Sequence, residues 1–133
     1  MSKELSEVLN LFRNEEFLKA EKKCSILLKK IKPNFELLNI YALILFKLKR
    51  YDESIWQWNK TIQMNSNFYF GYNNLGNVFL LKKNLTEALK NYEKAIEIKP
   101  DYFEAIFNKG NVFFELKEFQ KALKCYDKVI SLK

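Results

Sequence analysis

The sequence predicts an all-α fold built from helix hairpins, and three observations lead to it. Within residues 72–100, apolar side chains recur at i, i+3, i+4 and i+7, which is the spacing of one face of a helix. They form two stripes: Tyr72, Leu75, Gly76 and Phe79, then Leu85, Ala88, Leu89, Tyr92, Ala95 and Ile96. Asn84 separates the stripes, and Pro100 ends the second, because proline cannot continue a helix. The pattern returns at shifts of 34 residues in both directions, so the hairpin is a repeat.

Four repeats follow one another along the chain, at 1–34, 35–68, 69–102 and 103–133. The expected helix pairs are 3–14 with 17–31, 35–48 with 51–64, 69–81 with 85–98, and 103–116 with 119–132. Asp101 stands where its side chain can cap the first helix of the last repeat. We expect one domain over 1–133, and an N-terminal piece of a longer protein is an alternative.

One slot of the repeat holds only small residues, and another holds large aromatic ones. The small set is Ala20, Ser54, Ala88 and Ala122. The aromatic set is Trp58, Tyr92 and Tyr126. Small side chains let two helices approach closely, so we expect the two helices of each hairpin to meet at the small slot.

The spacing Tyr72-x2-Leu75-Gly76-x2-Phe79, followed by Ala88-x3-Tyr92 and Pro100, resembles the tetratricopeptide repeat (TPR) family. The resemblance covers the whole chain, about four repeats, although the first repeat lacks the glycine and the aromatic positions of its first helix. It implies an all-α, right-handed superhelical solenoid of four antiparallel helix hairpins. It does not imply one function, because such scaffolds serve many partners.

Composition excludes several classes of protein. Of the 133 residues 48% are hydrophobic, which argues against disorder. No run of 18 apolar residues predicts a membrane span, and the first residues do not resemble a signal peptide, so we expect a cytoplasmic protein. Cys24 and Cys125 lie three repeats apart and are predicted to be buried thiols, not a disulfide.

Catalysis finds little support in the sequence. The chain has no histidine, only three glycines and no CxxC pair, so a general acid–base residue, a phosphate-binding loop and a zinc site all lack their usual groups. We therefore expect no enzymatic activity, no metal and no cofactor.

The net charge of +7 is spread over the repeats. Counting Lys and Arg against Asp and Glu gives +3, +1, +1 and +2 in order, and lysines alternate with glutamates as on solvated helix faces. We therefore expect neither nucleic acid nor membrane as a partner. The local exception is a basic run in the first repeat, for which a patch for nucleic acid or an acidic partner is the alternative: Lys19, Lys22, Lys23, Lys29, Lys30 and Lys32.

A binding surface is expected where the first helices of successive repeats line a concave face. On the TPR pattern, the candidate peptide-binding residues are Asn39, Phe46, Lys47, Phe70, Asn73, Asn74, Asn77, Phe107, Asn108, Asn111 and Phe114. An asparagine amide offers both a donor and an acceptor, so it can pair with any peptide backbone. The pairs Asn74 with Asn108 and Asn77 with Asn111 resemble the asparagine ladder in TPR arrays of protein O-glycosyltransferases. The alternative is that these asparagines bond only to neighbouring helices. The pattern does not match the carboxylate clamp of chaperone cofactors, because only Asn74 fits it.

The leading hypothesis is a non-catalytic scaffold that binds a protein or peptide segment in the concave groove. A second hypothesis is the substrate-presenting N-terminal TPR region of a larger glycosyl- or sulfotransferase. A third is a self-assembling scaffold, a homo-oligomer formed through the stripe on the last helix: Leu123, Tyr126, Val129 and Ile130.

Overall fold

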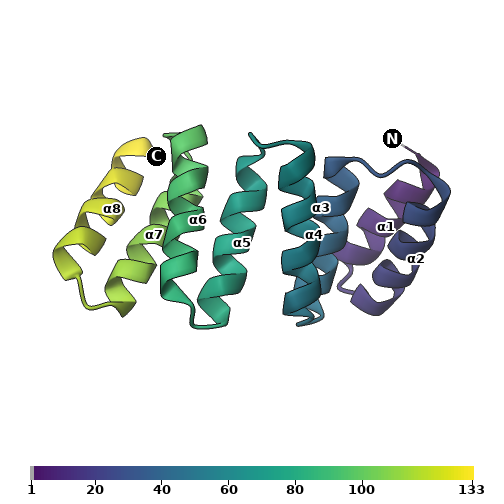
Figure 1. Cartoon of the computed structure of the whole chain (residues 1–133), viewed down its shortest axis with the longest axis horizontal. Helices are drawn as coiled ribbons and strands as arrows, with labels where there is room; N and C mark the ends of the chain where they lie inside the picture. Colours follow the sequence, from purple (N-terminus) through teal and green to yellow (C-terminus); the bar gives the residue numbers. More distant parts are fainter. Residues whose placement is uncertain (1) are drawn as a thin grey trace. The chain divides into compact units, whose positions relative to one another are not determined.

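The computed structural model describes residues 2–133, which form eight α-helices and no strand (Figure 1). The helices are α1 (Lys3–Arg13), α2 (Phe17–Lys30), α3 (Phe35–Lys47), α4 (Tyr51–Met64), α5 (Tyr69–Leu81), α6 (Leu85–Ile98), α7 (Phe103–Glu115) and α8 (Phe119–Leu132). The all-α prediction is confirmed, and four of the expected helices end one residue earlier than predicted. Among the described residues, every helix is too short or too polar to cross a bilayer.

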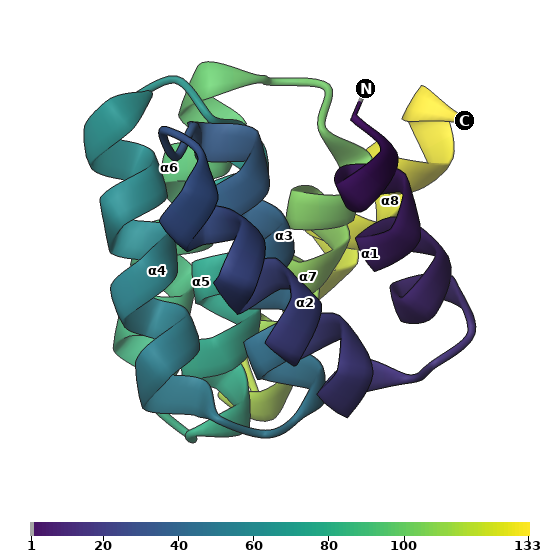
Figure 2. The ribbon, with the colours of Figure 1, turned by 90° about the vertical axis from the view of Figure 1, so that its right-hand side faces the viewer.

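The chain divides into two compact units, Met1–Asn65 and Ser66–Lys133. The first unit contains α1 to α4, and the second contains α5 to α8; each consists of two antiparallel hairpins. Figure 2 looks onto α1 and α2 of the first unit. In the second unit, α7 packs against α6 and also touches α5.

All four hairpins turn in the same way. The residue after the first helix's C-cap is left-handed in each, with φ of 60° to 63°, at Glu15, Lys49, Lys83 and Lys117. In the third repeat, the N–H of Lys83 donates to the carbonyl of Leu80 and that of Asn84 to the carbonyl of Phe79. This pair of bonds is the Schellman motif, and it satisfies carbonyls at the end of the helix.

Three helices begin at a side-chain cap. The side-chain oxygens of Ser2, Asn34 and Asn84 accept hydrogen bonds from backbone N–H groups in the first turns of α1, α3 and α6. The predicted cap by Asp101 is wrong. Tyr102 occupies the N-cap position of α7, and no side-chain cap forms there. The Asp101 carboxylate lies instead 3.9 Å from the Lys99 ammonium.

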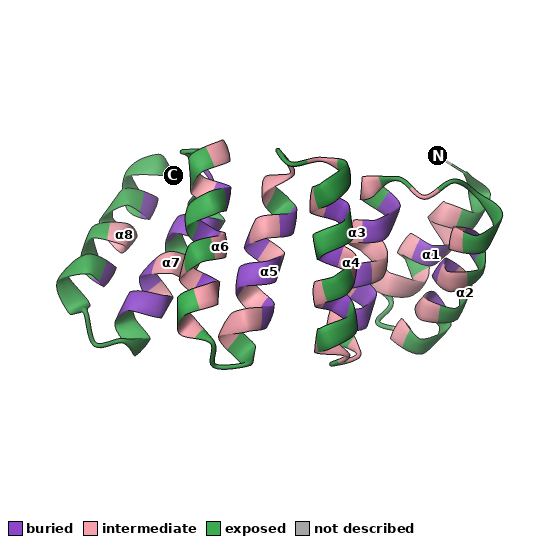
Figure 3. Cartoon of the chain, in the orientation of Figure 1, coloured by how far each residue is buried: buried purple, intermediate pink, exposed green. Residues whose placement is uncertain are grey.

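The small slot of the repeat lies in the interior of the protein. Its residues are almost completely buried, with exposed fractions of 0%, 0%, 0% and 2% for Ala20, Ser54, Ala88 and Ala122. Buried positions lie on the inner faces of the helices, whereas the outer face of α8 is largely exposed (Figure 3).

Candidate peptide-binding face

The second unit brings eight of the predicted site residues onto two neighbouring helices. α5 carries Phe70, Asn73, Asn74 and Asn77, and α7 carries Phe107, Asn108, Asn111 and Phe114. The spacing within each set places its members on one side of the helix. We call the surface of these residues the α5–α7 face.

Three asparagines link α5 to α7. The Asn108 Nδ2 group donates to Asn73 Oδ1 at 3.1 Å and to Asn77 Oδ1 at 3.3 Å. Asn73 is only 5% exposed, so it lies beneath the face and positions Asn108. The sequence predicted these residues to share a face and gave bonds to neighbouring helices as the alternative, but it did not identify the partners of each bond.

Two further asparagines hold the second helix of their own hairpin. The Tyr92 hydroxyl donates to Asn77 Oδ1 at 2.6 Å, and the Tyr126 hydroxyl donates to Asn111 Oδ1 at 2.7 Å. Burial raises the pKa of Tyr92, which keeps its hydroxyl protonated as a donor. These two asparagines therefore bond to the neighbouring helix of their own hairpin, as the alternative interpretation of the asparagines requires.

These bonds use only one end of each amide. The Nδ2 groups of Asn77 and Asn111 donate to no described residue, and the Oδ1 atom of Asn108 accepts from none. The face therefore offers both donors and an acceptor. An extended peptide backbone requires this combination, because its N–H and C=O groups alternate.

Three phenylalanines surround the amides and are partly open to solvent. Phe70, Phe107 and Phe114 are 43%, 47% and 58% exposed. Each ring packs against other rings: Phe70 against Phe68, Tyr69 and Tyr102, with 4.5 to 5.8 Å between centroids, Phe107 against Tyr126 at 5.7 Å, and Phe114 against Phe119 at 5.3 Å. Rings that are partly open to solvent can pack against apolar side chains of a ligand.

The formal charges at the ends of the α5–α7 face are negative. The eight residues that define the face are uncharged, and the exposed Glu104 and Glu115 of α7 stand near its two ends. The lysine of α7, Lys109, lies 4.0 Å from the Glu93 carboxylate of α6. The Glu104 carboxylate accepts a hydrogen bond from the Tyr102 hydroxyl at 3.2 Å. A surface without cations does not attract a carboxylate, which agrees with the absence of a carboxylate clamp in the sequence pattern.

The other three predicted site residues belong to α3 of the first unit. The Trp58 Nε1 group donates to Asn39 Oδ1 at 2.8 Å, and the Phe46 ring lies 6.0 Å from the Trp58 ring between centroids. Lys47 is exposed. Here a tryptophan replaces the tyrosine of the later repeats, and its N–H bonds an asparagine one turn earlier on the first helix.

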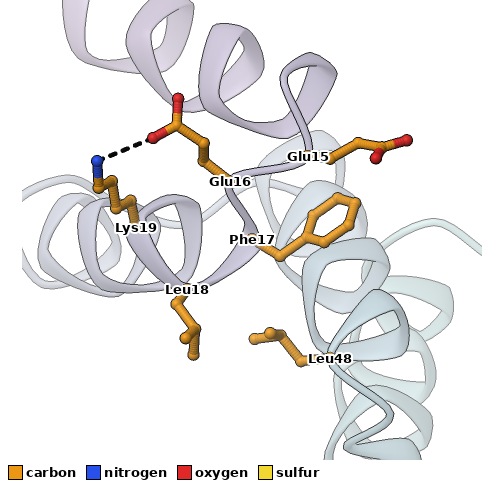
Figure 4. A pocket seen from close by; sticks show the side chains of 6 residues that line it. All are labelled: Glu15, Glu16, Phe17, Leu18, Lys19 and Leu48. Carbon is orange, nitrogen blue, oxygen red and sulfur yellow. Dashed lines mark ion pairs between the residues drawn. The ribbon is translucent and has the colours of Figure 1, made fainter.

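The sequence did not reveal a small hollow at the α1–α2 turn of the first unit (Figure 4). The side chains of Leu18 and Leu48 point into it, and Leu18 is 70% exposed. Glu16 and Lys19 form an ion pair of 2.9 Å at its edge. The charged side chains drawn in Figure 4 point away from Leu18 and Leu48, so we do not assign a binding or catalytic role to this hollow.

The cysteines are free, as predicted, and Cys24 is fully buried while Cys125 is half-buried. Burial, followed by the nearby Glu21 carboxylate, raises the pKa of the Cys24 thiol to about 12. Among the described residues, no group of three or more metal-ligating side chains is gathered in one place.

Two family models match the second half of the chain: "TPR repeat" over residues 76–117 and "Tetratricopeptide repeat" over residues 103–133. No curated protein sequence matches. The fold is similar to that of MamA, with a TM-score of 0.88 and 19% identity over 97% of this chain and 75% of that one. It is also similar to YrrB, described as a TPR protein with an unusual peptide-binding site, with a TM-score of 0.83 and 20% identity over 98% of this chain and 67% of that one.

A third similar structure is the second TPR of Spaghetti (RPAP3) bound to an HSP90 peptide, with a TM-score of 0.72 and 20% identity over 77% of this chain and 94% of that one. At these identities the similarity establishes the fold alone. Residues 76–133 therefore match tetratricopeptide repeat models, and the eight helices have the all-α fold of a tetratricopeptide repeat protein.

Proposed function

We propose that the chain is a non-catalytic protein-interaction scaffold that binds an extended peptide segment on the α5–α7 face. The observation that carries the proposal is the set of unused amide groups on Asn77, Asn108 and Asn111, with exposed phenylalanine rings beside them. The amides would hold the peptide backbone whatever its sequence. The rings would select apolar side chains.

Two similar proteins support a peptide as the ligand class. YrrB is described as having an unusual peptide-binding site, and the Spaghetti TPR is bound to an HSP90 peptide with the sequence SRMEEVD. The latter ligand is acidic. Glu104 and Glu115 of α7 flank the α5–α7 face, and none of the eight residues of the face is a cation, so we propose a neutral or basic peptide instead.

The test uses a display library of extended peptides selected on the full chain, followed by fluorescence anisotropy with the best peptide. Phe107→Ala/Asn108→Ala should weaken binding at least tenfold, because it removes one apolar contact and one amide acceptor. Asn91→Ala/Ile130→Ala is the matched control, since Asn91 lies on α6 and Ile130 on α8, away from the face. Equal affinity of both double variants would reject the site, and a selected peptide dominated by Asp and Glu would reject the charge argument.

Self-association through α8 is a second candidate function. Leu123 and Ile130 are 53% and 71% exposed, although their counterparts one repeat earlier, Leu89 and Ile96, are partly buried. Val129 is only 8% exposed, and Tyr126 is bonded to Asn111. These two residues of the predicted stripe therefore stabilise the hairpin. Sedimentation velocity from 5 to 500 μM tests this candidate: a dimer that Leu123→Lys/Ile130→Lys abolishes supports it, and a monomer throughout rejects it.

A further inference from the structure

The first hairpin has an open groove of about 720 Å³ between α1 and α2, independent of the α5–α7 face. One stripe of each helix lines it. The stripes consist of Lys3, Glu4, Glu7 and Leu11 on α1, and Lys19, Lys22, Lys23, Ile26, Leu27 and Lys30 on α2. All ten residues lie within the first unit.

Part of this groove corresponds to a surface that packs against a helix in the last repeat. In the last repeat, Ala105 and Val112 of α7 are fully buried and pack in clusters with α6, the helix before them. The same repeat positions in α1 are Lys3 and Asn10, which are exposed. The side of α7 that packs against another helix is apolar and buried. The equivalent side of α1 is therefore polar and exposed.

Most of the charge in the groove is positive and only partly compensated. Five lysines face two glutamates. Lys23 is paired with Glu7, whose pKa is lowered chiefly by this hydrogen-bonded contact, so the pair is ionised. Among the described residues, Lys22 and Lys30 have no ion-pair partner, and Lys3 forms no ion pair within 4 Å, although its charge also lowers the pKa of Glu7.

The groove also has an apolar strip between the charges. Ile26 is 54% exposed, and beside it in the lining are Leu27, which is almost buried, and Leu11, which is half-buried. A ligand that covers Ile26 and also neutralises the unpaired lysines needs an apolar side and an acidic side. The 14 residues of α2 span about 21 Å at 1.5 Å per residue, which is the length of a helix of about four turns.

We propose that the α1–α2 groove binds an acidic amphipathic helix of a partner protein. Leucine-type side chains of that helix would cover Ile26, and its carboxylates would pair with Lys3, Lys22 and Lys30. Helix-in-groove recognition of this kind uses anchors at i, i+3, i+4 and i+7.

Charge and composition disfavour two other occupants. A second copy that placed α8 in the groove would bring like charges together, because the exposed side of α8 carries Lys121, Lys124 and Lys128 against Asp127 alone. Nucleic acid would gain phosphate contacts from the lysines, but the lining has no aromatic ring and no arginine on which bases could stack.

The experiment measures binding of a fluorescent, hydrocarbon-stapled helix of 14 residues with leucines at i, i+3, i+4 and i+7 and glutamates at most other positions. The full chain is titrated against this probe, against the same probe with glutamines for glutamates, and against a 20-nucleotide single strand. Lys22→Glu/Lys30→Glu is compared with Lys90→Glu/Lys124→Glu, which makes the same change in net charge on exposed positions of the second unit.

We expect the acidic helix to bind the wild type. Its affinity should fall at least fivefold for Lys22→Glu/Lys30→Glu and should change less than twofold for the control variant. The glutamine probe and Ile26→Asp should each also weaken binding. Failure of the acidic helix to bind the wild type would overturn the proposal, as would equal losses in both double variants. Tighter binding of the single strand, lost with Lys22→Glu/Lys30→Glu, would assign the groove to nucleic acid instead. Circular dichroism verifies that each variant is folded.

Discussion

Replacing Gly76 by alanine tests the packing that holds the third hairpin together. A Cβ atom at this position would lie 2.5, 2.6 and 2.8 Å from three ring atoms of Tyr92. Real Cβ atoms do not approach other atoms so closely, so the ring or the helix has to shift. The Tyr92 ring is fully buried, and its hydroxyl is held by Asn77 at 2.6 Å, so little room exists for the ring to move.

Two opposing effects determine the magnitude. Overpacking a buried contact costs about 1–3 kcal/mol. Alanine in place of glycine within a helix recovers about 0.5–1 kcal/mol, because glycine loses more backbone entropy on folding. We expect Gly76→Ala to lower the free energy of unfolding by about 1 kcal/mol.

Urea denaturation followed by circular dichroism measures the change, and two comparisons isolate its cause. In a Tyr92→Leu background the ring is absent, so Gly76→Ala should become neutral or stabilising. Gly110→Ala places its Cβ 2.8 Å from the Tyr126 ring and 3.0 Å from the Cys125 Cβ. These contacts are longer than those at Gly76, and the Tyr126 ring is only half-buried and can move, so the cost should be smaller. The reasoning is refuted if Gly76→Ala stabilises the wild type. It is also refuted if Gly76→Ala lowers the free energy of unfolding by the same amount in the wild type and in Tyr92→Leu.

Three further predictions concern single groups. At pH 8 the folded chain should react with a disulfide reagent at Cys125 first, since Cys24 is 0% exposed and burial raises its pKa to about 12; equal rates without denaturant would contradict this. Tyr126→Phe removes the donor to Asn111 and should cost about 1 kcal/mol in urea unfolding, and an unchanged midpoint would show that the bond contributes nothing. Lys83→Gly should raise stability by about 1 kcal/mol, because Lys83 has a φ of 62° that glycine adopts without strain; a loss of stability would contradict this explanation.

The periodicity of the sequence was sufficient to predict the helices and the small slot. Apolar spacing fixes which side of each helix is buried, and the 34-residue shift carries that inference from the clear third repeat to the weaker first one. Ala20 illustrates this, because its repeat lacks the signature residues of the first helix and yet it is fully buried. The ends of helices were harder to predict: the left-handed turn residues are Glu and Lys rather than glycine, so composition did not reveal them.

The candidate site was predictable in its position but not in its hydrogen bonds. Spacing placed Asn77 and Asn108 on one side of their helices, but it does not show which amide atom faces inward. The sequence did contain a clue to the tyrosine–asparagine bonds. Where the aromatic slot holds tyrosine, as at Tyr92, the repeat position of Asn77 holds asparagine, whereas Leu43 stands at that position in the repeat of Trp58.

The positive charge of the α1–α2 groove was predictable, because four of its five lysines belong to the basic run of the first repeat. The contribution of α1 was not, because the sequence does not show that Glu7 pairs with Lys23.

The most direct test of the proposed function is a nitrogen–proton NMR spectrum of the full chain, with assigned asparagine side-chain amides, recorded with and without the selected peptide. Binding on the α5–α7 face predicts the largest shifts at the Nδ2 groups of Asn77, Asn108 and Asn111, with little change at Asn91 on α6. Shifts confined to the outer face of α8 or to the α1–α2 groove, with these three amides unmoved, would contradict the account.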